Sequence, residues 1–168
     1  MAQHEQSDPG DIVIRIRGLV TGFGRKVIHD HLDLDVRRGE VLGVVGGSGS
    51  GKSVLLRTII GLIHPREGKV EVLGQPVTEV EGDRMRTLEM RWGVLFQEGA
   101  LFSSQTVAEN IQVPLREYTQ MSQELMDEIV AVKLGLVGLA PDAANKYPRE
   151  LSGGMKKRAG LARALALD

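Results

Sequence analysis

The chain has 168 residues, of which 26% are charged, and a formal net charge of −1, values that are ordinary for one globular domain. This near-neutral balance excludes the strongly basic surface of a nucleic-acid-binding protein, so no nucleic-acid partner is expected. The sequence contains no cysteine, which excludes a disulfide framework, and no apolar run approaches the roughly 20 residues of a membrane span.

The N-terminal part of the sequence predicts a disordered segment followed by two strands. Residues 1–11 carry three carboxylates and no apolar core, which favours disorder and argues against a signal peptide. In residues 12–17 and again in 32–37, apolar side chains alternate with mostly charged ones. This alternation is typical of strands that have one face in water, as in an antiparallel sheet.

A glycine-rich segment at 46–53 reads G-G-S-G-S-G-K-S and matches the P-loop pattern G-x-x-x-x-G-K-[ST]. The apolar run at 41–45 predicts a buried strand before it, and residues 54–60 predict the first turns of a helix after it. Backbone N–H groups of such a loop wrap around phosphate oxygens, and the helix dipole favours the anion. The alternative is a chance turn in a chain with 21 glycines. The residues of the predicted nucleotide site are Gly46, Ser48, Gly49, Ser50, Gly51, Lys52 and Ser53.

Two residues of this loop carry specific chemistry. Lys52 would bring its charge to the β- and γ-phosphates, and the hydroxyl of Ser53 would ligate Mg²⁺. The segment therefore predicts binding of a nucleoside triphosphate together with its metal ion.

Shorter elements follow the predicted helix. Residues 65–68 predict a turn, and residues 69–73 predict a short strand that ends at Gly74. Ser122 is placed to N-cap a further helix. The apolar residues of that helix that recur at helical spacing are Leu125, Ile129, Val132 and Leu136.

The segment 151–158 reads L-S-G-G-M-K-K-R and leads into a helix rich in alanine and leucine. Ser152, Gly153 and Gly154 would stand at the N-terminus of this helix, where hydroxyl, amides and dipole can face an anion. The simpler alternative is an N-capped helix after a glycine turn. Together with the P-loop, the segment resembles the signature motif of ABC-type ATPases.

This resemblance implies roles for further residues. In the family the signature motif contacts the γ-phosphate that the P-loop of a second subunit holds. The resemblance therefore implies three catalytic residues, which are Lys52 of the P-loop, Ser152 of the signature motif and Gln97. Gln97 follows the apolar run at 92–96, expected as a strand, where the family has a glutamine that touches Mg²⁺ and the attacking water. Phe23 falls where the family stacks an aromatic ring on adenine; a partly buried strand-end phenylalanine is the alternative.

The resemblance also implies the fold: an α/β P-loop NTPase core with an N-terminal antiparallel β element and a helical subdomain insert. One ABC ATPase domain is expected over residues 12–168, with its core at 12–96 and the helical subdomain at about 97–163. The insert is too short for the coiled coils of chromosome-maintenance relatives. A GTPase is disfavoured because residues 145–148 begin like N-K-x-D but place Pro148 where the carboxylate must stand.

Among transporters, segments 96–102 and 113–117, together with Met155, resemble the ATPase subunit of Mla-type, Mce-associated phospholipid transporters. This implies ATP and Mg²⁺ as cofactors and a homodimer of ATPase subunits beneath integral membrane permease subunits. A periplasmic lipid-binding protein would be an indirect partner. The implied location is peripheral, on the cytoplasmic face of the inner membrane.

One departure from the family concerns the end of the sequence. The family continues with the Walker B strand, which supplies an Asp for Mg²⁺ and a Glu that polarises water, and then with a switch histidine. No counterpart precedes Asp168, so an incomplete domain, truncated before Walker B and unable to hydrolyse ATP alone, is expected. The alternative function is a non-catalytic nucleotide-binding fragment that lacks Walker B and the switch histidine.

Overall fold

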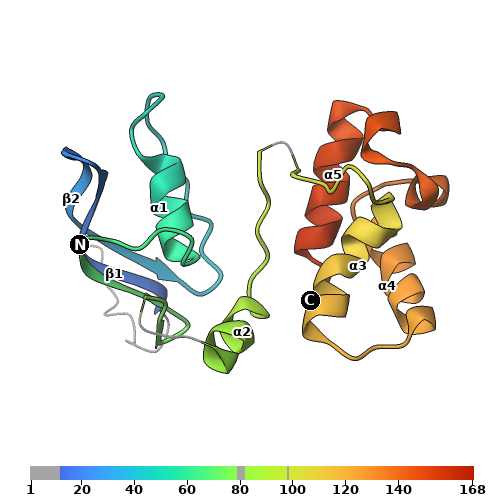
Figure 1. Cartoon of the computed structure of the whole chain (residues 1–168), viewed down its shortest axis with the longest axis horizontal. Coiled ribbons are helices and arrows are strands. Elements are labelled where there is room, and N and C mark those ends of the chain that lie inside the picture. The colour runs from blue at the N-terminus through green and yellow to red at the C-terminus, as the bar shows by residue number, and fades with distance from the viewer. Residues whose placement is uncertain (1–11, 79–81, 98) are drawn as a thin grey trace, which may run out of the picture. The chain divides into compact units, whose positions relative to one another are not determined.

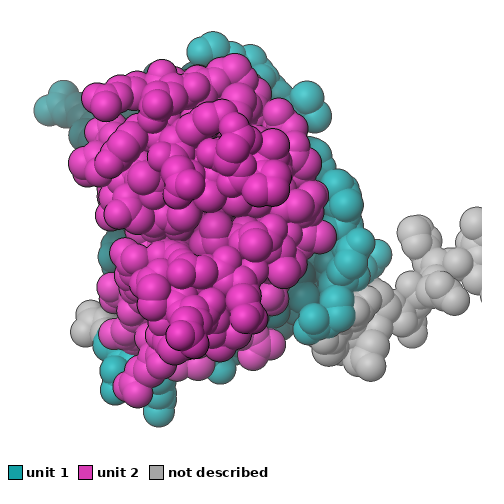
Figure 2. All heavy atoms as spheres, turned by 90° about the vertical axis from the view of Figure 1, so that its right-hand side faces the viewer, with its two compact units in different colours: residues 1–85 teal, residues 86–168 magenta. Residues whose placement is uncertain are grey.

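A computed structural model describes residues 12–78, 82–97 and 99–168, so the predicted disordered segment 1–11 lies outside the described residues. The chain divides into two compact units, residues 1–85 and residues 86–168, which are coloured separately in Figure 2. This division lies N-terminal to the start of the helical subdomain expected at Gln97.

Four antiparallel strands form the sheet of the first unit, in the order β2-β1-β3-β4 (Figure 1). The strands are β1 (Ile12–Phe23), β2 (Lys26–Arg37), β3 (Glu67–Val72) and β4 (Gln75–Pro76). Ile16 of β1 pairs with Leu34 on one side and with Val70 on the other, and both Ile16 and Val70 are fully buried. The antiparallel element predicted from the alternating pattern is therefore confirmed.

Helix α1 (Lys52–Ile59) follows the glycine-rich loop, as predicted. It begins after Gly51, whose φ of 95° lies in the left-handed region that favours glycine. Leu55, Thr58 and Ile59 form its buried face, and the helix contacts β3. This packing fixes the C-terminal end of the glycine-rich loop to the first unit.

Residues 41–45, predicted to form a buried strand, form no strand in the structure. Val41 is 98% exposed and Val45 is 95% exposed. A strand needs a neighbour for its backbone groups, and within the described ranges no strand pairs with this segment. Strand formation depends on such distant partners as well as on local pattern, so the prediction was wrong here. Residues 92–96, also expected as a strand, form none.

Helices dominate the second unit and supply the helical insert of the predicted fold class (Figure 1). Helix α2 (Asp83–Glu89) spans the division between the units. The remaining helices are α3 (Val107–Tyr118), α4 (Gln123–Leu136), the short 3-10 helices η2 (Pro141–Asn145) and η3 (Pro148–Glu150), and α5 (Gly153–Ala164). One apolar cluster joins them, and it includes Ile111 of α3, Val130 of α4 and Ala159 of α5.

Each of the three long helices of this unit has a side-chain cap at its N-terminus. Thr106 caps α3 by accepting a hydrogen bond from Glu109 N, and the Glu109 carboxylate accepts one from Thr106 N, which completes a capping box. Ser122 caps α4, which confirms the predicted start of that helix. Ser152 caps α5 in the same way. These caps fix where each helix begins and so place the segments that precede them.

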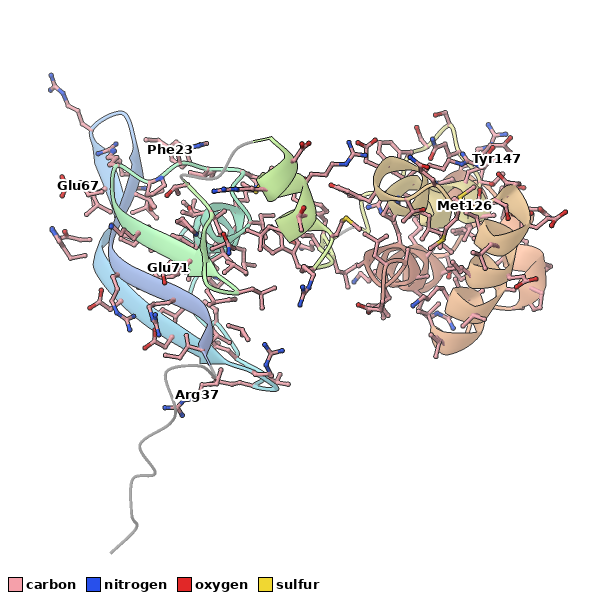
Figure 3. All side chains as sticks on the ribbon, turned by 90° about the horizontal axis from the view of Figure 1, so that it is seen from below. Phe23, Arg37, Glu67, Glu71, Met126 and Tyr147 are labelled. Carbon is pink, nitrogen blue, oxygen red and sulfur yellow. The ribbon has the colours of Figure 1, made fainter. Side chains whose placement is uncertain are left out.

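The apolar residues that recur at helical spacing in α4 do not form its most buried face. Leu125, Val132 and Leu136 are 43%, 60% and 67% exposed, and only Ile129 of this set packs, partly buried, against the apolar cluster. The helix buries Met126, Val130 and Leu134 instead, which follow one another at the same helical spacing. Figure 3 shows Met126 among the helices of the second unit. Since α4 has two apolar stripes, its packing against α3 and α5 decides which one is buried.

Two neighbouring valines test this assignment. We expect Val130→Ala to lower the free energy of unfolding by about 2 kcal/mol, because Val130 is only 4% exposed and its loss leaves a cavity. Val132→Ala is the matched control, since it removes the same atoms from the same helix at a position that is 60% exposed. Its effect should stay within about 0.5 kcal/mol. Urea denaturation measures both, and equal losses would contradict the observed face.

Candidate functional site

The glycine-rich loop at 46–53 approaches β2 closely at Gly51. A Cβ atom at Gly51 would lie 2.6 Å from Ile28 Cγ2 and 2.8 Å from His29 Nε2, so no larger residue fits there. Gly49 also has a left-handed φ, of 80°. The glycines therefore permit both the backbone conformation of this loop and its close approach to the sheet.

Lys52 folds back over this loop. Its ammonium donates hydrogen bonds to Gly46 O at 2.7 Å, to Gly47 O at 2.8 Å and to Ser50 Oγ at 3.2 Å. Two of these acceptors are neutral carbonyl oxygens at the exposed side of the loop. An anionic phosphate oxygen is a stronger acceptor than a neutral carbonyl, so the ammonium is placed to exchange these bonds for bonds in which both partners are charged.

The N-terminus of α1 has no side-chain cap, unlike those of α3, α4 and α5. Its N-cap residue, Gly51, makes no side-chain hydrogen bond, and the first turn contains no acidic residue. The first N–H groups of a helix have no partner within the helix, so here they are available to an anion. Ser53 stands in this first turn and is exposed. Loop, lysine and helix end thus fit the phosphates of a nucleotide.

A buried pair beneath the loop was missed in the sequence. Thr21 Oγ1 of β1 and His29 Nδ1 of β2 are hydrogen-bonded at 2.6 Å, and the other ring nitrogen, Nε2, approaches Gly51. Burial lowers the pKa of His29 below its ordinary value, which favours the neutral ring. This neutral pair contacts the loop at Gly51. No local motif reveals it, because two strands and the loop must first come together.

Phe23 ends β1 at the β1–β2 turn, opposite Lys26 (Figure 3). Its side chain is 57% exposed. The ring is therefore accessible to a ligand, and its position at the end of β1 also fits the alternative of a strand-end phenylalanine. Stacking on adenine stays a prediction.

The second predicted phosphate contact lies at the N-terminus of α5. Ser152 Oγ accepts a hydrogen bond from Met155 N at 3.2 Å, so the simple capping role is present. Gly153 and Gly154 are exposed, and a Cβ atom at either would meet no atom within 4 Å. The first turn carries no acidic residue. This helix end is open enough for an anion, and its contact with a nucleotide stays a prediction.

Gln97 is exposed and lies in a tight turn that a hydrogen bond from Gly99 N to Phe96 O closes at 2.8 Å. The predicted site residues thus form two groups. Phe23 and residues 46–53 belong to the first unit, and Gln97 belongs to the second unit with residues 152–154.

Metal binding at residues 46–53 would depend on a bound nucleotide. Throughout the part of the chain that the structure describes, no three His, Cys, Asp or Glu side chains are grouped to hold a metal ion. Magnesium commonly binds through one or two protein ligands and the phosphates of a nucleotide, so the Ser53 hydroxyl fits this mode. No helix among the described residues is sufficiently long and apolar to cross a membrane.

Comparisons with known proteins identify the family of this chain. The sequence model of the family described as "ABC transporter" matches residues 29–168. A probable ribonucleotide transport ATP-binding protein, mkl of Mycobacterium leprae, is 44% identical over 160 residues, which cover 95% of this chain and 46% of that protein. The intermembrane phospholipid transport system ATP-binding protein MlaF of Haemophilus influenzae is 40% identical over 156 residues, which cover 93% of this chain and 59% of that protein.

A solved structure has a similar fold. It is a dimeric ATP-binding cassette in a post-hydrolysis state bound to ADP and Pi, with a TM-score of 0.83 and 29% identity, covering 91% of this chain and 69% of that one. The chain spans about half the length of the curated relatives it matches.

Proposed function

Because this chain belongs to the ABC transporter family, we propose that it is the ATP-binding part of an ATPase subunit that drives the transport of phospholipid. The geometry of residues 46–53 carries this proposal. There the Lys52 ammonium is held by neutral loop oxygens beside a helix N-terminus that no side chain caps. Such an arrangement binds the phosphates of ATP.

Each site residue has a role in this proposal. The backbone N–H groups of residues 46–53 hold the phosphates, and Lys52 neutralises charge on the β- and γ-phosphates. The Ser53 hydroxyl ligates Mg²⁺, and the exposed ring of Phe23 stacks on adenine. Gln97 orients the attacking water and contacts the metal ion. These roles combine electrostatic stabilisation with positioning, which supply most of the catalysis in phosphoryl transfer.

The signature segment serves a second subunit. In a homodimer, Ser152, Gly153 and Gly154 of one subunit dock on the γ-phosphate that the partner's P-loop holds. The open N-terminus of α5 supports this role, because its first turn lacks both acidic residues and obstructing side chains. The solved relative of similar fold is a dimer bound to ADP and Pi.

Phospholipid is the proposed cargo, and integral membrane permease subunits are the proposed partners. The ATPase subunits sit at the cytoplasmic face of the inner membrane, and a periplasmic lipid-binding protein is an indirect partner. The support comes from segments 96–102 and 113–117 and from the name of the H. influenzae relative. The name of the M. leprae relative points instead to ribonucleotide, so the test compares both cargoes.

The test uses the full-length protein reconstituted in phospholipid vesicles with the permease subunits that co-purify with it. We expect ATP hydrolysis to rise severalfold with phospholipid relative to detergent alone, and to be indifferent to added ribonucleotide. A Lys52→Ala complex supplies the background rate. A response to ribonucleotide, sugar or amino acid without a lipid effect would place the chain in another transporter branch. Binding of ATP without hydrolysis in any of these mixtures would favour the non-catalytic alternative.

A further inference from the structure

Arg163, in the last turn of α5, binds the backbone that follows Gln97. Its guanidinium donates to Gly99 O and to Ala100 O, both at 2.9 Å, and lies 5.7 Å from the centre of the Phe102 ring. Gly99 and Ala100 have left-handed φ values of 76° and 46°. This turn thus presents two consecutive carbonyls to one planar side chain, a geometry that a two-pronged guanidinium matches.

The same turn packs against the backbone of α5. A Cβ atom at Gly160 would lie 2.8 Å from the Cα atom of Gly99, and one at Gly99 would lie 2.7 Å from Lys156 O. A Cβ atom at Gly93, on the other side of Gln97, would clash with Ala164 O. The segments on both sides of Gln97 therefore lie directly against the signature helix.

Asn110 holds the next part of this segment to α3. It is fully buried, its amide donates to Phe102 O at 3.1 Å, and its side-chain oxygen accepts from Phe102 N at 2.8 Å. The amide also donates to Gln105 O and Thr106 O. Since its oxygen also lies 3.5 Å from Arg163 Nη1, the two side chains fix one continuous stretch of loop.

These contacts connect Gln97 to Ser152. The hydrogen bond from Gly99 N to Phe96 O closes the turn that contains Gln97, and Arg163 holds the carbonyl of that same Gly99. Ser152 caps the other end of α5, about 18 Å away along a 12-residue helix. A helix transmits displacement as a rigid rod, so a shift of the signature end moves the turn as well.

We propose that Arg163 is a positioning residue that holds the Gln97 turn on the signature helix, so that docking of Ser152 on a nucleotide and placement of Gln97 occur together. This inference rests on the proposed function, which assigns docking on the nucleotide to Ser152 and orientation of the attacking water to Gln97. The guanidinium acts through the backbone of residues 99 and 100, to whose carbonyls it donates.

The test measures steady-state ATP hydrolysis by the full-length assembly carrying Arg163→Ala. We expect kcat to fall by about 10- to 100-fold, the cost of misplacing a water-orienting group by roughly 1 Å, while KM and ATP affinity stay near wild type. Arg163→Lys should restore part of kcat, because one ammonium reaches one carbonyl. Arg149→Ala is the control for kcat, because Arg149 lies outside the signature segment and its guanidinium lies 5.4 Å from the centre of the Tyr147 ring. It should leave kcat unchanged. Arg158→Ala is the control for the distance measurement below, because Arg158 lies on the same helix and donates to a different loop carbonyl, Gly138 O.

A second measurement does not depend on hydrolysis. Spin labels at Ser104 and Lys157, in a cysteine-free background, report the distance between the loop and α5. We expect one narrow distance distribution in the parent protein and in Arg158→Ala, and a broad one in Arg163→Ala. An unchanged distribution, or a loss of ATP affinity equal to the loss of kcat, would overturn the proposal. If the parent protein hydrolyses no ATP, the proposed function fails, while the label distances still decide whether Arg163 holds the turn.

Discussion

We expect Lys52→Ala to weaken binding of ATP with Mg²⁺ by about 1.5–3 kcal/mol, which corresponds to roughly a 10- to 150-fold higher Kd. The lysine ammonium is the cation that residues 46–53 bring to the phosphates, and a hydrogen bond to a charged group is worth this amount. Titration calorimetry on the full-length protein measures the change.

Lys52 also bonds three oxygens of its own loop, so the variant could act by loosening the loop. Lys52→Met keeps the bulk of the side chain and should lose the same affinity, because only the charged donor is missing. Lys69→Ala, on the exposed face of β3, is the control for net charge and should bind as the parent does. Parental affinity in Lys52→Ala would remove the P-loop assignment.

The local parts of this fold could be predicted from the sequence. Alternation in residues 12–17 and 32–37 gave two paired strands, because one-sided burial leaves a period of two. Ser122 and Ser152 mark two helix starts, because their hydroxyls accept hydrogen bonds from N–H groups three residues later. The capping box of Thr106 and Glu109 was equally readable and was overlooked, although Pro114 obscures the helix that follows it.

The parts that failed depend on residues distant in sequence. The run at 41–45 is apolar enough for a buried strand, yet pairing requires a neighbour that the described residues do not supply. The two stripes of α4 are both apolar, so the sequence alone does not rank Val130 above Val132. Contacts such as His29 with Gly51, and Arg163 with Gly99, join separate elements and carry no local signature.

The residues of the candidate site also differ in how far the sequence alone could identify them. The P-loop could be identified because its backbone demands glycine at fixed positions, and the structure shows why at Gly51. Gln97 and Phe23 were placed by family resemblance alone, since an exposed glutamine or phenylalanine has no distinctive pattern.

The two phosphate-binding helix ends should respond differently to substitution. We expect Ser152→Arg to leave the ATP affinity of a single subunit nearly unchanged, because residues 46–53 hold the nucleotide in the other unit. Closure of the dimer around ATP should fail. A long cation then occupies the N-terminus of α5, where the partner's γ-phosphate must dock, and it also opposes the helix dipole. Hydrolysis should fall by about 100-fold or more, the cost of losing an electrostatic contact to the reacting group.

The loss of the Ser152 cap must be separated from the loss of dimer closure and hydrolysis. Ser152 accepts a hydrogen bond from Met155 N, and removing an N-cap costs about 0.5–2 kcal/mol of stability. Ser122→Arg makes the same substitution at the same cap position of α4, where Ser122 accepts from Leu125 N. That control should lose similar stability and retain ATP-driven dimerisation and hydrolysis.

A mixture of Lys52→Ala and Ser152→Arg subunits tests whether the two residues serve one nucleotide from different chains. In a mixed dimer, one composite site combines the intact Lys52 of one subunit with the intact Ser152 of the other, and the second site carries both defects. We expect the mixture to recover part of the hydrolysis that each variant lacks alone. Light scattering with ATP reports dimerisation beside the rate. Normal dimerisation and hydrolysis by Ser152→Arg alone would show that residues 151–155 only cap a helix. If Ser152 contacted the γ-phosphate, an arginine in its place would impair both.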